Sequence, residues 1–166
     1  LAYEVYCRIS DSWNNKASGI DHATMGAIAS VAGVARLLRL TTPQIIEAIN
    51  LATVANITLA QTRLGHVSNW NACAFAYANR NAIFAAQLAA RGMTGPAPIF
   101  EGRNGFFKIV SREPFELGPF GGDGRPFRIM QCDLRRYPLG NLSQTVVAAA
   151  VEARALVGDV RHIVEV

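Results

Sequence analysis

Two long stretches of small residues constrain this sequence more than any other feature. The first, residues 22–40, sets apolar side chains at helical spacing among alanine, glycine and serine, so that it is nearly apolar on every side. The second, residues 70–91, carries nine alanines. A helix without a polar face is buried among other helices, and its small side chains allow close approach. These stretches predict a mainly α fold of closely packed helices.

Start and stop signals predict further helices around these two. Asp21 is a suitable N-cap for the first stretch, and Gly92 ends the second. Thr42 followed by Pro43 predicts another helix start. Within the helix that follows, we expect the core-facing side chains to include Ile46 and Val54. The expected helices cover residues 1–10, 22–40, 43–60 and 70–91, with a short one near 102–109.

The character of the sequence changes in its second half. Residues 92–128 hold more than half of the 14 glycines and most of the seven prolines, which predicts largely irregular structure. Beyond them the pattern predicts a strand over 127–134, a helix over 143–157 and a strand over 160–166. A strand–helix–strand unit after a helical body indicates a second domain of α+β type. We therefore expect a helical body over 1–126 and the beginning of an α+β domain over 127–166.

Charge and cysteine content narrow the classes of function. The formal net charge is +4, but 14 of the 16 basic residues are arginines scattered along the chain, with no basic run beyond Arg135–Arg136. This disfavours nucleic-acid binding, which needs a clustered basic face. The cysteines stand far apart without a Cys-x-x-Cys pair, so neither a zinc site nor a disulfide framework is indicated, and we expect a reducing, cytoplasmic compartment. Cys73 lies in an alanine-rich run and is expected in the core; the other two are Cys7 and Cys132.

The ends and the surface of the chain suggest a fragment. The longest uncharged stretch, residues 64–79, contains several polar side chains and predicts no membrane span, which needs about 20 predominantly apolar residues. No signal peptide is visible. Only 17% of residues are charged, so we expect part of the surface to be covered by something outside this chain. Because the chain begins at Leu1 within a helical pattern and stops at Val166 within a strand-like pattern, we expect an internal piece of a longer protein.

His22 is the first candidate for chemistry. It follows Asp21 at the expected first helical position, where main-chain N–H groups and the positive helix end converge. This field favours a neutral imidazole that can act as a base near pH 7, and the same helix end attracts a carboxylate. The arrangement suits proton abstraction next to a carboxylate. The alternative is a histidine that only bonds near its own helix cap.

The remaining candidates have weaker signals. His66 and Arg63 lie in the loop before residue 70, which is either part of a site or a flexible surface loop. Arg135 and Arg136 end the first expected strand at a proline turn, where they either bind carboxylates across a domain cleft or form a solvated edge. His162 is expected to be a surface strand residue and receives no role. No glycine-rich phosphate loop, nucleophile elbow or paired metal-ligand motif is present.

Four runs of the sequence follow one another in an order seen in a known family. They are GIDHATMGAIASVAGVARLLRLTTPQIIEAINLA (19–52), SNWNACAFAYANRNAIFAAQLAARGMTGP (68–96), FEGRNGFF (100–107) and LRRYPLGNLSQT (134–145). Together they resemble the MmgE/PrpD family, which includes 2-methylcitrate dehydratase and cis-aconitate decarboxylase, and the resemblance covers essentially the whole chain. It implies a helical domain with a smaller α+β lid inserted in it, and an active site in the cleft between the two.

The resemblance also implies roles for individual residues. His22 matches the family's active-site histidine, and Thr24 matches the threonine beside it. Arg135 stands where the family usually has lysine, so that anion binding survives while proton transfer does not. Asn71 also replaces a usual lysine, which removes one charged partner for a substrate carboxylate. Leu142 stands where dehydratase members can carry a histidine.

The function that these features predict is a dehydratase-type lyase on a small di- or tricarboxylate such as 2-methylcitrate. The resemblance further implies a homodimer that works without metal or redox cofactor. We expect neither a nucleic-acid nor a membrane partner. A decarboxylase, an epimerase and a non-catalytic dimerising subunit are the alternatives that the residues leave open. In this hypothesis His22 is catalytic, and the substrate-binding residues are Thr24, Arg63, Asn71, Arg135 and Arg136.

Overall fold

The mainly α fold is confirmed in a computed structural model that describes residues 1–66, 68–159, 161 and 163–165. The chain forms two compact units, residues 1–131 and 132–166. Among the described residues, extended pairing is limited to two isolated bridges. The first unit contains α1 (Ala2–Ser12), α2 (Ala23–Leu37), α3 (Thr42–Ala55), η1 (Ala60–Arg63), α4 (Trp70–Ala90), the π-helical turn η2 (Phe107–Ser111) and η3 (Arg128–Gln131); the second contains α5 (Ser143–Ala153) and η4 (Arg154–Leu156).

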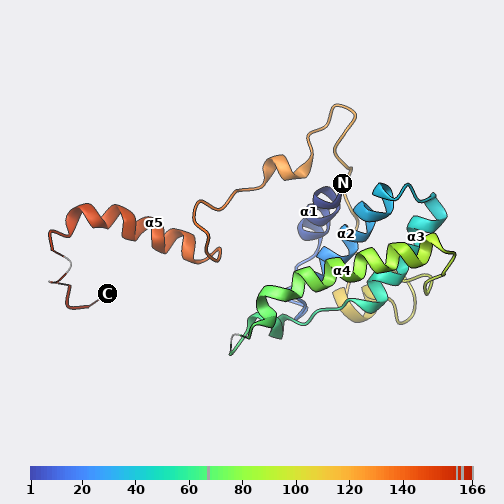
Figure 1. The fold of residues 1–166 in the computed structure, drawn as a ribbon, viewed down its shortest axis with the longest axis horizontal. Helices are drawn as coiled ribbons and strands as arrows, with labels where there is room; N and C mark the ends of the chain where they lie inside the picture. The colour runs from blue at the N-terminus through green and yellow to red at the C-terminus, as the bar shows by residue number, and fades with distance from the viewer. Residues whose placement is uncertain (67, 160, 162, 166) are drawn as a thin grey trace. The chain divides into compact units, whose positions relative to one another are not determined.

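Helix α2 is the centre of the first unit. It packs against α1, α3 and α4, which lie around it in Figure 1. Where α2, α3 and α4 meet, the buried side chains are Val31 and alanines, as the small residues predicted for α2 and α4. Close packing of this kind leaves little room for larger side chains. The fully buried alanines of this layer are Ala35, Ala48, Ala52, Ala82 and Ala86.

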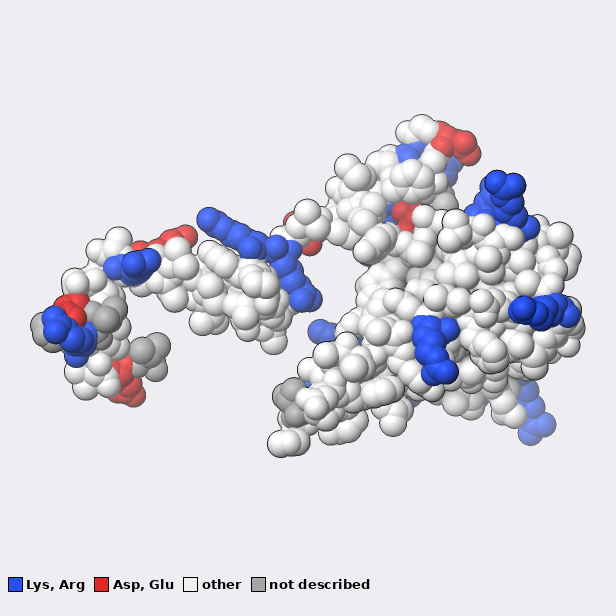
Figure 2. Space-filling model, viewed as in Figure 1, with Lys and Arg blue, Asp and Glu red and all other residues white. Residues whose placement is uncertain are grey.

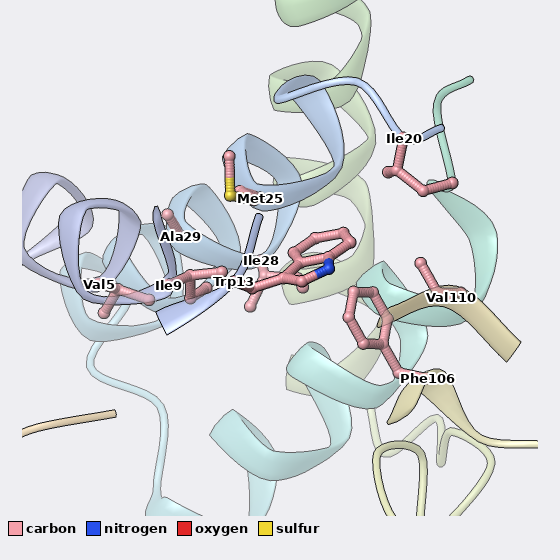
Figure 3. Packing of buried hydrophobic residues seen from close by; sticks show 9 residues of the cluster. All are labelled: Val5, Ile9, Trp13, Ile20, Met25, Ile28, Ala29, Phe106 and Val110. Atoms are coloured by element: carbon pink, nitrogen blue, oxygen red, sulfur yellow. The ribbon is translucent and has the colours of Figure 1, made fainter. Parts of the chain in front are cut away.

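A second, aromatic core joins α1 and α2 to the turn η2 (Figure 3). The rings of Trp13 and Phe106 meet edge to face with their centroids 5.2 Å apart. Phe115 stacks on Trp13 at 6.1 Å and also meets Phe106 edge to face at 6.4 Å. Such ring pairs add to the free energy gained from burying their area. They anchor the glycine- and proline-rich segment after α4 onto the helical core.

The α-helix starts lie within one residue of the predicted ones, whereas α3 ends at Ala55, well before the predicted end at residue 60. α3 begins one residue earlier than expected, because Thr41 rather than Thr42 forms the N-cap, and Gln44 Oε1 accepts the Thr41 N–H at 3.0 Å. α4 ends at Ala90, and Gly92 follows with φ at +88°, a conformation that favours glycine. α2 begins at Ala23, so that His22 occupies the N-cap position instead of the first helical one.

Three predicted core positions are wrong. Ile46 and Val54 of α3 are 53% and 52% exposed, and Cys73 of α4 is also exposed. The buried face of α3 consists instead of smaller side chains, among them Ala48 and Ala52. The prediction had placed the largest apolar side chains of this helix in the core, and for that reason it was wrong.

The strand predicted over 127–134 is also wrong, because this segment contains the 3-10 turn η3. The buried Glu4 carboxylate of α1 accepts the main-chain N–H groups of Gly121 at 2.8 Å and Arg128 at 2.5 Å. The Arg128 guanidinium also pairs with Asp11. These contacts hold the segment on α1, and its N–H groups are used there instead of in a sheet.

Later predictions have mixed outcomes. The helix expected over 143–157 appears as α5 followed by η4. The strand expected over 160–166 includes residues 160, 162 and 166, which lie outside the described residues, and so does His162. The α+β lid and its boundary near residue 126 stay predictions.

The surface of the first unit carries few charges. On the face that Figure 2 shows, its Lys and Arg side chains stand apart, with uncharged surface between them. No helix among the described residues has the length and apolarity needed to cross a membrane.

Candidate active site

A short antiparallel contact fixes the start of α2. Ile20 bridges Leu59, the Asp21 N–H donates to the Thr58 carbonyl at 2.7 Å, and the Ala60 N–H donates to the Gly19 carbonyl at 2.9 Å. The loop after α3 is therefore tied to the residues just before α2. This contact brings η1 beside His22, although the two are about 40 residues apart in the sequence.

Asp21 is a buried, ion-paired carboxylate, with 3% of the residue exposed. The Arg63 guanidinium donates to both of its oxygens, from Nε at 2.9 Å and from Nη2 at 3.3 Å. The Ala23 N–H adds a third hydrogen bond at 2.9 Å. Burial alone would raise the pKa of Asp21, but these hydrogen bonds and the nearby His22 outweigh it and hold the pKa below its usual range. Asp21 is therefore ionised at neutral pH.

His22 stands at the N-cap of α2 with its ring partly open to solvent. Its side chain is 45% exposed, and Nδ1 lies 3.3 Å from Asp21 Oδ2. The ring also contacts Phe75 of α4, with the centroids 5.7 Å apart and the planes tilted by 32°. The imidazole is thus held between a carboxylate and an aromatic ring while part of it remains accessible. This geometry suits a general acid or base.

Arg63 and Asn71, two of the predicted substrate-binding residues, contact each other. Arg63 Nη1 donates to the main-chain carbonyl and to the side-chain Oδ1 of Asn71. Because Asn71 is the second residue of α4, this contact ties η1 to the start of that helix. The Arg63 guanidinium therefore bridges Asp21 beside α2 and Asn71 in α4.

Thr24 lies in the interior, with only 1% of its surface exposed. Its hydroxyl accepts the Thr58 N–H at 2.8 Å and lies 3.5 Å from the Thr58 carbonyl oxygen. Thr24 therefore supports the loop contact that shapes the site. Its predicted contact with substrate stays a prediction.

Arg135 and Arg136 belong to the second unit, in a turn that Gln144 of α5 supports. The Gln144 side chain pairs with the main-chain N–H and carbonyl of Tyr137 at 3.0 and 2.9 Å. The Arg136 guanidinium lies 5.6 Å from the Tyr137 ring centroid, and Arg135 donates to the Leu139 carbonyl at 3.3 Å. Both arginines line a shallow pocket of about 340 Å³ within this unit. Their approach to His22 stays a prediction.

The other residues singled out in the sequence are exposed. His66 lies in a bend between η1 and α4, and Leu142, at the N-cap position of α5, is 89% exposed. Among the residues that the structure describes, no group of three or more His, Cys, Asp or Glu side chains is placed to hold a metal ion.

The sequence did not indicate two further residues of the site, Asp21 and Tyr6. Asp21 was expected only to cap a helix, and its place directly before the histidine was the one available signal. Tyr6 of α1 carries no such signal; burial raises the pKa of its phenol, the negative charge of Asp21 raises it further, and Arg63 opposes the change. Tyr6 also lines a pocket of about 420 Å³ together with Phe75 and Gly26. A Cβ at Gly26 would lie 2.5 Å from the Phe75 ring, so glycine is needed for this close packing.

These features define the class of protein: a helical domain that presents a partly exposed histidine at a helix start, backed by a buried ion pair. The family model described as the MmgE/PrpD N-terminal domain matches residues 1–117. The chain belongs to the MmgE/PrpD family, as its sequence runs indicated. This family includes dehydratases and suggests a dehydratase-type or related function in general.

Proposed function

We propose that the protein is a dehydratase-type lyase on a small di- or tricarboxylate such as 2-methylcitrate, and that the reaction begins with proton abstraction next to a carboxylate. The observation that carries this proposal is His22, partly exposed at the start of α2 and backed by ionised Asp21. Membership of a family that includes dehydratases supports it. The helix start supplies a favourable field for the negative charge of the substrate.

Three groups of side chains have separate roles in the proposed reaction. His22 takes the proton from the carbon next to the carboxylate, and the electron pair of that bond first remains on carbon. The pair then forms a C=C double bond as the C–O bond to the hydroxyl on the neighbouring carbon breaks, and the hydroxide takes up a proton and leaves as water. Arg135 and Arg136 bind substrate carboxylates, because a guanidinium matches a carboxylate with two parallel hydrogen bonds. Asn71 in place of the usual lysine leaves one cation fewer, which favours a substrate with one carboxylate fewer. The chemistry is acid–base throughout and uses no metal or redox cofactor.

Product mass separates this reaction from its nearest relatives. A decarboxylase and an epimerase also begin next to a carboxylate. The complete protein should be offered a panel of di- and tricarboxylates, and each product analysed by mass. Loss of water supports the proposed dehydratase. Loss of carbon dioxide or an unchanged mass would instead assign one of the other two reactions.

Replacement of His22 is the direct test of the catalytic role. His22→Ala in the complete protein should lower turnover by roughly 10²–10⁴-fold, the usual contribution of a positioned acid or base. The helical circular dichroism spectrum should not change, because the ring is partly exposed. His66→Ala is the matched control, since His66 is exposed in the neighbouring bend. Equal turnover in the two variants would remove His22 from the mechanism.

A non-catalytic dimerising subunit is the second candidate. The specific observation in its favour is that Arg63 and Asn71 hydrogen-bond to each other, so that two expected substrate-binding side chains are already engaged. Calorimetric titration of the panel acids into the complete protein distinguishes the two candidates. If no acid either binds or reacts, the non-catalytic role is favoured.

We also propose a cytoplasmic homodimer. The exposed apolar side chains of α3 and α4 support an interface on the helical body, and multi-angle light scattering of the complete protein would reveal a monomer if this is wrong. The scattered cysteines support a reducing compartment. The exposed apolar side chains of these two helices include Ile46, Val54, Ile83 and Phe84.

A further inference from the structure

The Asp21 carboxylate lies between a histidine and an arginine. His22 Nδ1 is 3.3 Å from Oδ2, which also accepts Arg63 Nε at 2.9 Å. Tyr6 of α1 also acts on this point, and its pKa is raised by burial, by the Asp21 charge and by Cys7. Asp21 is thus a buried negative charge with its strongest partner on one side and the imidazole on the other.

This placement bears on which ring nitrogen of His22 carries the proton. An ionised carboxylate can only accept hydrogen bonds. The negative charge on Oδ2, 3.3 Å from Nδ1, also favours N–H at that nitrogen, which places the proton on Nδ1 and the lone pair on Nε2. The tautomer of a neutral histidine is set in this way by the partner of its other nitrogen.

We propose that Asp21 is a positioning residue that fixes the proton of His22 on Nδ1, and that Arg63 holds Asp21 ionised and in place. The role of Nε2 in this inference rests on the proposed function. The C–H bond next to the substrate carboxylate breaks, its electron pair stays on carbon, and its proton goes to Nε2. The imidazolium that results is stabilised by Asp21.

Arg63 also limits the effect of Asp21 on His22. A lone carboxylate this close would favour the charged imidazolium, which cannot accept a proton. The guanidinium offsets part of that negative charge, because it donates to both oxygens of Asp21. Arg63 therefore weakens the electrostatic attraction between Asp21 and a charged imidazole.

The same contacts change the role of Arg63 from the one predicted. Its Nε and Nη2 atoms serve Asp21, and Nη1 serves Asn71. A substrate carboxylate would reach this guanidinium only by displacing a protein group. Asn71 fits this role, because its amide oxygen accepts from the guanidinium, whereas a lysine there would set two positive charges against each other.

The test is the tautomer of His22, measured by nitrogen-15 NMR on the complete protein labelled at histidine. The natural protein should show a proton on Nδ1. In Asp21→Asn the new amide can donate to Nδ1, so the proton should move to Nε2. Turnover should fall by about 10²-fold or more, with a smaller change in KM. Asp11→Asn, which breaks another Asp–Arg pair, is the matched control and should change neither property.

A second variant keeps the proposal testable if Asp21→Asn does not fold. Arg63→Gln leaves the carboxylate without its main counter-charge, so His22 should titrate at higher pH than in the natural protein. A purely structural ion pair would lower the unfolding midpoint without moving this titration. An unchanged titration in folded Arg63→Gln, or a proton that stays on Nδ1 in folded Asp21→Asn, would overturn the proposal.

The NMR result is independent of the proposed reaction. If the tautomer and titration behave as expected while the natural protein turns over none of the acids, the positioning role stands and the proposed lyase function fails. If the protein is active but the tautomer does not respond to Asp21→Asn, the lyase stands and the positioning role fails.

Discussion

The start of α2 holds three neighbouring residues with different roles: Asp21, His22 and Thr24. Asp21 is buried and charged, His22 is half exposed, and Thr24 is buried with its hydroxyl on Thr58. In this Asp-His-x-Thr motif, His22 is the candidate for chemistry, and Thr24 supports the structure. Of the three side chains, that of the histidine is the most exposed.

Thr24 allows a clear prediction. Thr24→Val keeps the shape of the side chain but leaves the Thr58 N–H without its acceptor, which should cost about 1–3 kcal/mol of unfolding free energy. Thr24→Ser keeps the hydroxyl and is the matched control. Urea unfolding of both variants measures the difference. If stability is unchanged while KM rises for the substrate, Thr24 is a substrate contact instead.

At the scale of single residues, the sequence predicted the candidate histidine, His22, but not the ion pair between Asp21 and Arg63 that lies behind it. His22 could be found because a helix start and a family motif coincide on it. The pairing of Asp21 with Arg63 could not, because 42 residues separate them and no periodic pattern links the loop to the helix start. The contact depends on the small antiparallel bridge between Ile20 and Leu59, which carries no sequence signal.

At the scale of elements, the positions of the helices along the sequence were easier to predict than which face of each helix is buried. α4 was predicted from residue 70 to 91 and spans 70–90, because Gly92 stops it. The exposed side of α3 could not be predicted, since its apolar residues occupy more than one face and packing selects the small ones. The strand predicted over 127–134 failed because a buried carboxylate far along the chain binds the main chain there.

The contacts of Glu4 in α1 predict that the stability of the first unit depends on pH. Burial would raise its pKa, but hydrogen bonds from Gly121, Arg128 and Arg8 outweigh burial and hold the pKa below the usual value. A carboxylate with a lowered folded-state pKa stabilises the fold above its unfolded pKa of about 4.3, and the effect is lost as pH falls through the folded pKa. Glu4→Gln should therefore destabilise the first unit at pH 7, and this difference should shrink as pH falls below about 4.3.

Amide hydrogen exchange locates the effect. At pH 7 the Glu4→Gln variant should lose protection over residues 121–128, because two of its N–H groups donate to Glu4. Glu101→Gln is the control, since Glu101 is exposed. If the two variants differ from the natural protein by equal amounts, or if the difference does not shrink as the pH is lowered until Glu4 is protonated, Glu4 does not hold this segment through its charge.

At the scale of the molecule, α2 joins structure to site. Its middle is packed on the alanine layer and the aromatic core, and its first residues carry the candidate chemistry. A helix that is fixed along its length presents its N-terminus in a defined place, which is what positioned catalysis requires. The composition of small residues, visible in the sequence, is therefore the physical reason that His22 can be held in place.

The central claim is that His22 moves a proton at the carbon next to a substrate carboxylate. The most direct measurement is deuterium uptake at that carbon, followed by mass spectrometry of recovered acid and product in heavy water. The natural complete protein should incorporate deuterium there, and His22→Ala should do so roughly 10²–10⁴-fold more slowly. Turnover without deuterium at that carbon, or equal exchange in the natural protein and the variant, would contradict the account.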